Sequence, residues 1–222
     1  MLKLWICGSS GQIGSALNEV LNPLEFEVFD TDIDEVDVTD IHEVMRFADI
    51  NRPDVIINCS GVTHIDVCEK DPKLAYKVNA LGARNLAIAA AKINSKMVQL
   101  SSDDVFDGRS DHAYKEFDKT NPMTVYGKSK LAGENYVKEF TYKHFIIRST
   151  WVYGKGENFV TNFLKKVQKN EPLSIAADQY GSPTSANELA KFILYMIQTN
   201  EYGTYHATCK GSCSRYEFAK EI

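Results

Sequence analysis

Hydrophobic and polar positions follow two different periods along the chain. Five short runs of mostly apolar residues have the length and composition of buried parallel strands: 2–7, 26–29, 54–58, 96–100 and 144–148. Between these runs, apolar residues recur every three or four positions, which indicates amphipathic helices after residue 12, around 74–88 and at 124–140. Alternating strands and helices predict an α/β fold with a doubly wound parallel sheet and helices on both faces.

The first strand runs into a glycine-rich turn, Gly8-Ser9-Ser10-Gly11-Gln12-Ile13-Gly14, and a helix follows it. Gly8 permits the tight turn, Gly11 lets the backbone approach a pyrophosphate, and Gly14 lets the helix pack closely on the sheet. The helix N-terminus adds free N–H groups and a partial positive charge. This strand–turn–helix unit predicts a Rossmann-like site for a dinucleotide such as NADH or NADPH.

An acidic residue follows the second predicted strand. Asp30 lies about 20 residues after the glycines, where a carboxylate is placed to bind a ribose 2′-hydroxyl. If the strand runs further than its apolar pattern indicates, Asp32 takes this role instead. A carboxylate here repels a 2′-phosphate, which favours NADH over NADPH.

The strand–helix alternation loosens after about Trp151. We expect residues 1–150 to form the NAD(P)-binding domain, and residues 151–222 to form a small, partial substrate-binding lobe that is interleaved with the core. The elements expected after Trp151 are helices at 159–169, 187–198 and 215–222, and short strands at 173–175 and 204–206.

Candidate catalytic residues follow the fourth predicted strand and open the helix after it. Polar residues stand where predicted strands end, at 58–61, 101–102 and 149–151, and ligands bind at this edge of a parallel sheet. Tyr126 and Lys130 are four residues apart, so they share a helix face.

We expect the ammonium of Lys130, together with the positive charge of a nicotinamide, to lower the pKa of the Tyr126 phenol. Ser102 then orients a substrate carbonyl, Tyr126 protonates the developing alkoxide, and Lys130 also holds ribose hydroxyls. Tyr216 has the same spacing to Lys220, but it does not follow a serine-ended strand. Asn79 is either a further polar member of the site or a residue that caps a neighbouring loop.

Charge and composition exclude several other classes of protein. A net charge of −5 without basic runs gives no electrostatic basis for binding nucleic acid or an anionic membrane. No stretch of 18 apolar residues and no signal peptide is present, so we expect a cytoplasmic location. Cys7 and Cys59 lie in or beside core strands, as buried thiols in a reducing compartment do. Cys209 and Cys213 have only His206 near them, so no metal site is assigned.

These motifs and several longer runs resemble the extended short-chain dehydrogenases, and within them the dTDP-4-dehydrorhamnose reductase family. The resemblance extends along nearly the whole chain, and its most specific parts are Arg148-Ser149-Thr150-Trp151-Val152-Tyr153-Gly154 and Asp178-Gln179-Tyr180-Gly181-Ser182-Pro183-Thr184. The other matching runs are residues 8–14, 37–40, 52–59, 101–108 and 122–134.

The resemblance implies that the chain reduces the 4-keto group of dTDP-4-dehydrorhamnose, a nucleotide sugar, to give dTDP-L-rhamnose with NADPH or NADH. It allows for a homodimer. It also implies that Ser102, Tyr126 and Lys130 are catalytic, and that Ser102, Asp103 and Trp151 contact the substrate. The residues implied to bind the cofactor are Gly8, Gly11, Gln12, Ile13, Gly14, Asp30, Asp37, Val38, Ser60, Gly61, Thr63 and Lys130.

Three features depart from the family pattern. Ser102 stands where the family usually has threonine, and the hydroxyl is kept. Asp104 stands where the family usually has tyrosine, so its carboxylate either alters sugar choice or faces solvent. Family members continue well beyond Ile222, so the substrate lobe is expected to be truncated.

Two alternative functions remain open from the sequence. One is a different nucleotide-sugar reductase or a 4-epimerase of the same superfamily. The other is a non-catalytic regulatory subunit similar to that of methionine adenosyltransferase. The intact set of Ser102, Tyr126 and Lys130 favours an enzyme.

Overall fold

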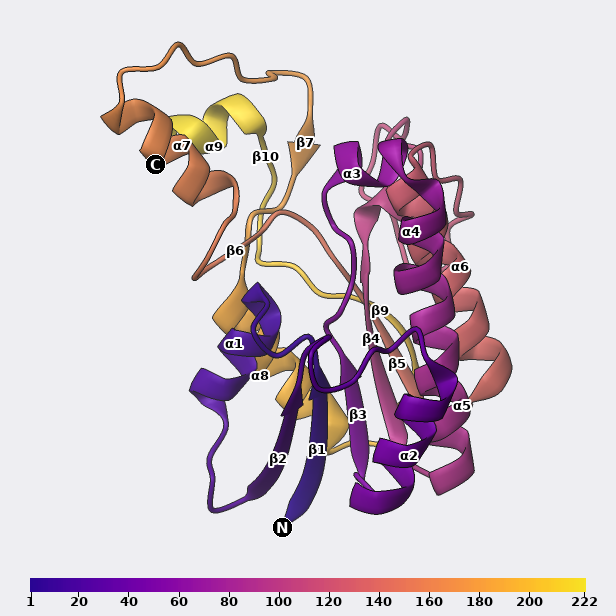
Figure 1. Ribbon diagram of the computed structural model, residues 1–222. Helices are drawn as coiled ribbons and strands as arrows, with labels where there is room; N and C mark the ends of the chain where they lie inside the picture. Colours follow the sequence, from indigo (N-terminus) through magenta and orange to yellow (C-terminus); the bar gives the residue numbers. More distant parts are fainter.

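The apolar runs form the strands of one parallel sheet. The computed structural model describes residues 1–222, and its central sheet has six strands in the order β2-β1-β3-β4-β5-β9, with every neighbouring pair parallel (Figure 1). The strand order reverses between β1 and β3, which is the point where ligands bind in open α/β sheets. The strands are β1 (Leu2–Cys7), β2 (Phe26–Thr31), β3 (Val55–Asn58), β4 (Lys96–Ser102), β5 (His144–Ser149) and β9 (Gly203–His206).

Helices cover both faces of this sheet, so the predicted doubly wound, Rossmann-like fold is confirmed. One face packs on α1 (Gln12–Val20) and α8 (Ala186–Ile197), and the other packs on α2, α5 and α6 (Figure 1). Buried aliphatic side chains of the strands point alternately into these two layers, because successive residues of a strand face opposite sides. The second layer consists of α2 (Ile41–Asn51), α5 (Ala83–Ile93) and α6 (Val125–Phe140).

The helical region predicted around 74–88 exists, but it is not one regular helix. It consists of α4 (Pro72–Tyr76), a π-helix η1 (Lys77–Gly82) and then α5, and α3 (Ile65–Lys70) precedes it. The Asp71 carboxylate caps α4 by accepting a hydrogen bond from the Leu74 amide at 3.0 Å. The apolar spacing gave no sign of the wider π turn, because a single such turn shifts the period by only one residue.

The predicted helix at 124–140 is confirmed as α6, which begins one residue later. The Thr124 hydroxyl caps it by accepting a hydrogen bond from the Gly127 amide at 2.9 Å. A short 3₁₀ helix, η2 (Asp103–Val105), connects β4 to the loop before α6.

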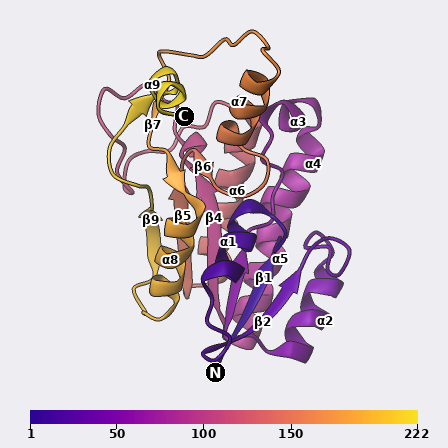
Figure 2. The same cartoon turned by 90° about the vertical axis from the view of Figure 1, so that its left-hand side faces the viewer.

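The last third of the chain contributes to two regions of the molecule. Figures 1 and 2 show α7 and α9 beyond the carboxyl end of the sheet. In contrast, α8 packs against α1, and β9 pairs with β5 as the edge strand of the main sheet. The remaining elements are β6 (Val152–Tyr153), α7 (Phe159–Gln168), β7 (Tyr180–Gly181), β8 (Thr184–Ser185), β10 (Cys213–Ser214) and α9 (Arg215–Glu221).

The strand expected at 173–175 was a wrong prediction. This segment has no regular structure, and Leu173 is 43% exposed. A short apolar run forms a strand only where a neighbouring strand offers backbone partners, and none pairs here. The strand expected at 204–206 exists as β9, but it completes the sheet and does not belong to the lobe. No helix is long and apolar enough to cross a membrane.

Candidate active site

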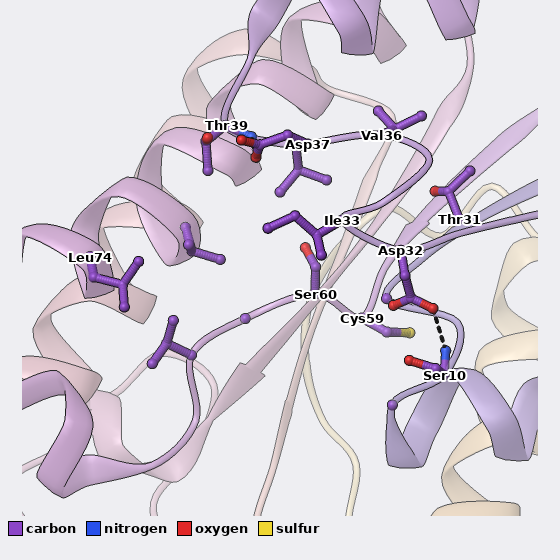
Figure 3. Close-up of a pocket in the computed structure, with 16 residues that line it drawn as sticks. Ser10, Thr31, Asp32, Ile33, Val36, Asp37, Thr39, Cys59, Ser60 and Leu74 are labelled. Carbon is purple, nitrogen blue, oxygen red and sulfur yellow. Dashed lines mark hydrogen bonds between the residues drawn. The ribbon is translucent and has the colours of Figure 1, made fainter.

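A cavity of about 380 Å³ opens at the point where the strand order reverses. Its walls come from the glycine turn, from the end of β2 and the residues after it, from the loop after β3, and from Leu74 and Val78 of α4 and η1 (Figure 3). Six of the residues expected to bind the cofactor line it, namely Gly8, Gly11, Asp37, Val38, Ser60 and Gly61.

The glycine turn is built for close backbone contacts. Gly8 adopts a φ of +75°, and a Cβ there would lie 2.7 Å from the Ser60 backbone nitrogen. A Cβ at Gly14 would lie 2.5 Å from the Gly8 carbonyl oxygen. No side chain caps α1, so the amides of its first turn are left free beside the cavity. This end of α1 therefore fits an anionic pyrophosphate.

The other residues expected to bind the cofactor lie outside the cavity walls. Gln12 turns toward Gly154, and Ile13 packs against the core beneath α1. Thr63 is exposed in the loop after β3.

The structure places Asp32, not Asp30, at the cavity (Figure 3). Strand β2 continues through Thr31, one residue beyond Asp30, which corrects the expected position of the acidic residue. The Asp30 carboxylate accepts hydrogen bonds from Asn18 Nδ2 at 3.0 Å, on the side of α1. Asp32 Oδ2 instead accepts from the Ser10 amide at 2.9 Å, within the glycine turn.

The structure brings the three predicted catalytic residues to the carboxyl end of β4. Ser102 ends β4, and Tyr126 and Lys130 lie on the first two turns of α6. The start of α6 packs directly on η2, the short helix after β4. The contact is so close that a Cβ at Gly127 would lie 2.0 Å from the Asp104 carbonyl oxygen. The Lys130 ammonium lies 3.8 Å from the position of a Cβ at Gly61, beside the cavity wall.

Burial dominates the ionisation of this group. It raises the pKa of Tyr126 well above its usual value, although a side-chain hydrogen bond with Ser102 opposes this effect. Burial also lowers the pKa of Lys130 to about 8. The charges of Asp104 and Asp103 act in the same direction as burial, so the pKa of Tyr126 is raised in the protein without a nicotinamide. The expected lowering, which includes the positive charge of the nicotinamide, stays a prediction.

Asn79 joins the loop after β3 to helix α6. Its Oδ1 accepts a hydrogen bond from the Val62 amide at 2.8 Å, and its Nδ2 donates to the Val62 carbonyl at 3.0 Å. Nδ2 also donates to Ser129 Oγ at 2.9 Å, and Ser129 Oγ donates to the Tyr126 carbonyl at 2.7 Å. Asn79 therefore fixes the loop after β3 relative to α6, which is closer to the loop-capping role than to direct chemistry.

Two acidic residues contact the Ser102 hydroxyl. Ser102 Oγ donates to Asp103 Oδ1 at 2.9 Å and accepts from the Asp104 amide at 3.1 Å. Thr150 Oγ1 donates to the second oxygen of Asp103 at 2.5 Å. Burial, together with the charge of Asp103, raises the pKa of Asp104 to about 6.

Trp151 stands at the same edge in a conformation that side chains rarely adopt, with a φ of +46°. The guanidinium carbon of Arg215 lies 3.6 Å from the centroid of its ring. A Cβ at Gly181 would come within 2.6 Å of the same ring. The predicted contact between Trp151 and a hexose therefore needs a ring face or edge that these two neighbours leave open.

Arg215 was not identified from the sequence, which also left open the two roles considered for Asn79. Asn79 falls on a predicted apolar helix face, where a lone polar residue was the available signal. Arg215 lies more than 60 residues from Trp151 along the chain, and no local pattern connects the two. No group of three or more His, Cys, Asp or Glu side chains could hold a metal ion.

Known proteins share this arrangement of elements. The family model described as RmlD substrate binding domain matches residues 2–222. The dTDP-4-dehydrorhamnose reductase of Aggregatibacter actinomycetemcomitans is 37% identical over 230 residues, which cover 100% of this chain and 78% of that protein.

Two solved structures superimpose closely. The dTDP-4-dehydrorhamnose reductase of Clostridium acetobutylicum has a TM-score of 0.97 and 43% identity, covering 99% of this chain and 79% of that one. The dTDP-4-dehydrorhamnose reductase of Bacillus anthracis, solved in complex with NADP, has a TM-score of 0.96 and 43% identity, covering 100% and 80%. The chain belongs to the RmlD substrate-binding-domain family.

Proposed function

We propose that the protein reduces the 4-keto group of a nucleotide-linked deoxysugar, dTDP-4-dehydrorhamnose, to dTDP-L-rhamnose with NADPH or NADH. The observation that carries this proposal is the meeting of Ser102, Tyr126 and Lys130 beside the cavity that the glycine turn lines. The relatives support it, since several are named dTDP-4-dehydrorhamnose reductase and one of them was solved with NADP.

The cavity residues fit a nicotinamide coenzyme, which supplies the hydride when it is bound. The free amides at the start of α1 would hold its pyrophosphate, and Asp32 would accept a hydrogen bond from its adenosine ribose. Lys130, beside Gly61 in the cavity wall, would hold the hydroxyls of the nicotinamide ribose.

The polar groups at the end of β4 would act on the sugar. The Ser102 hydroxyl, which donates to Asp103 Oδ1 in this structure, would turn to donate to the substrate carbonyl oxygen and fix its orientation. Tyr126 would then give its phenolic proton to the developing alkoxide. Because burial raises its pKa, Tyr126 keeps this proton at neutral pH, as a donor in the direction of reduction must.

The direct test follows the oxidation of NADH and of NADPH with dTDP-4-dehydrorhamnose generated in place. Turnover that depends on the sugar supports the proposal, and the two rates give the cofactor preference. Cofactor binding without oxidation by this sugar contradicts the proposed substrate. Tightly retained NAD with no net oxidation would indicate an epimerase instead.

A further inference from the structure

A fully buried carboxylate lies one helical turn beyond Lys130. Both oxygens of the Glu134 side chain are held: Ser101 Oγ donates to Oε1 at 2.6 Å, and Arg148 donates from Nε to Oε1 at 2.8 Å and from Nη2 to Oε2 at 2.7 Å. The Lys138 ammonium lies 3.6 Å from Oε2. A buried ion pair commonly adds no more stability than apolar side chains of the same size, so stability alone does not explain this cluster.

The two residues that Glu134 holds are direct neighbours across the sheet. Ser101 of β4 pairs with Arg148 of β5 in the parallel register, and both are buried. Ser101 immediately precedes Ser102, the residue that ends β4. Glu134 therefore connects the helix of the proposed proton donor to the strand end that carries the proposed carbonyl-binding hydroxyl.

Glu134 follows Lys130 by four residues on the same face of α6, and both side chains are buried, so the carboxylate also acts on the charge of Lys130. Two acidic groups can favour the ammonium form of Lys130 when they are ionised. They are the Glu134 carboxylate, on the same helix, and the Cys59 side chain, just after β3. Burial raises the pKa of Cys59 to about 12, so this thiol is uncharged at neutral pH. Glu134 is then the negative charge that opposes the effect of burial on Lys130.

We propose that Glu134 is a positioning residue of this site. Its carboxylate fixes α6 against Ser102 and supplies the negative charge that keeps Lys130 an ammonium. The inference rests on the proposed reductase function, and it goes beyond it by assigning a role to a group that touches neither sugar nor cofactor.

The first test needs no turnover. In protein labelled with ¹³C-lysine, the Lys130 signal is assigned by its loss in Lys130→Met and titrated in the wild type and in Glu134→Gln. We expect the midpoint to fall by roughly one pH unit in Glu134→Gln, because an opposite charge is removed from a buried ammonium. Glu139→Gln removes an exposed carboxylate from the same helix and should leave the midpoint unchanged. An unchanged midpoint in Glu134→Gln overturns the inference.

The second test separates positioning from folding. Glu134→Gln leaves Arg148 buried without its counter-charge, so both Tm and kcat should fall, kcat by roughly 10- to 100-fold. The alkaline limb of kcat/KM should move to lower pH together with the Lys130 midpoint. The double variant Glu134→Leu/Arg148→Met replaces the pair with apolar side chains and should restore Tm but neither kcat nor the alkaline limb.

The outcomes separate the two proposals. Recovery of kcat together with Tm in the double variant means that the pair is only structural, and it overturns the inference. A wild type that reduces no dTDP-4-dehydrorhamnose contradicts the proposed function, whereas the Lys130 titration still decides whether Glu134 sets its charge.

Discussion

Asp32 brings a carboxylate to the cavity wall, and no lysine or arginine lines the same cavity. A 2′-phosphate would meet this charge without a cationic partner, so the protein should bind NADH more tightly than NADPH. In Asp32→Ser we expect this preference to fall by roughly tenfold, which corresponds to ~1.4 kcal/mol. The measurement is the dissociation constant of each cofactor, followed by protein fluorescence.

The matched control for this prediction is Asp30→Ser. Asp30 is also acidic and only two residues away, but it faces Asn18 and not the cavity. Asp30→Ser should therefore leave the dissociation constants of NADH and NADPH unchanged. The opposite result, in which Asp30→Ser loses the preference for NADH and Asp32→Ser keeps it, would contradict this prediction. It would mean that Asp30 meets the adenosine ribose, as the apolar pattern of the strand alone indicated.

The phenol of Tyr126 is the proposed proton donor, so Tyr126→Phe should lower kcat by roughly 10²- to 10⁴-fold while NADH still binds. Tyr216→Phe is the control, because Tyr216 has the same spacing to a lysine but is half exposed on α9. Steady-state kinetics of both variants show whether the place of the tyrosine in the fold matters, or only its four-residue spacing to a lysine. Equal turnover in Tyr126→Phe and the wild type would remove Tyr126 from the mechanism.

At the scale of elements, α6 depends on a glycine for its approach to the π-helix. A Cβ at Gly133 would lie 2.4 Å from the Asn79 carbonyl oxygen and 3.3 Å from the Ala83 Cβ. Gly133→Ala should therefore displace α6 and destabilise the fold by ~1–3 kcal/mol, despite the higher helix propensity of alanine. Urea unfolding measures this change.

The control for Gly133→Ala lies on the exposed side of the same helix. Asn135→Ala should be neutral or slightly stabilising, since only helix propensity changes there. If Gly133→Ala proves equally neutral, the close contact between α6 and the π-helix is relaxed in solution. In that case the kcat of Gly133→Ala should also equal that of the wild type.

Elements with a strong period were predictable from the sequence, and irregular ones were not. The run at 96–100 and the spacing at 124–140 located β4 and α6 within two residues, and with them Ser102, Tyr126 and Lys130. The π turn around Asn79 and the buried Glu134–Arg148 pair depend on contacts between distant segments, which no local period records. The exact end of β2, which decides between Asp30 and Asp32, is set by pairing with β1.

At the scale of the whole molecule, the cofactor half of the protein depends on the end of the chain. Helix α8 covers the same face of the sheet as α1, and it buries Leu189, Ile193, Met196 and Ile197. Strand β9 protects the edge of β5. We therefore expect a division after residue 150 to separate regions of the sequence but not folding units.

A fragment of residues 1–150 should consequently fail to fold cooperatively. Removing four large buried side chains of α8 forfeits about 6–12 kcal/mol at ~1.5–3 kcal/mol each, which is comparable with the whole stability of a domain, about 5–15 kcal/mol. Calorimetry should show one transition for the full chain and none for the fragment. Leu189→Ala in the full chain weakens the same contact without removing α8. It should lower the free energy of unfolding by ~2–5 kcal/mol while a single transition remains. A fragment that melts cooperatively near the Tm of the full chain would mean that α1 and the sheet need no cover from α8, and that residues 1–150 are a domain in the energetic sense.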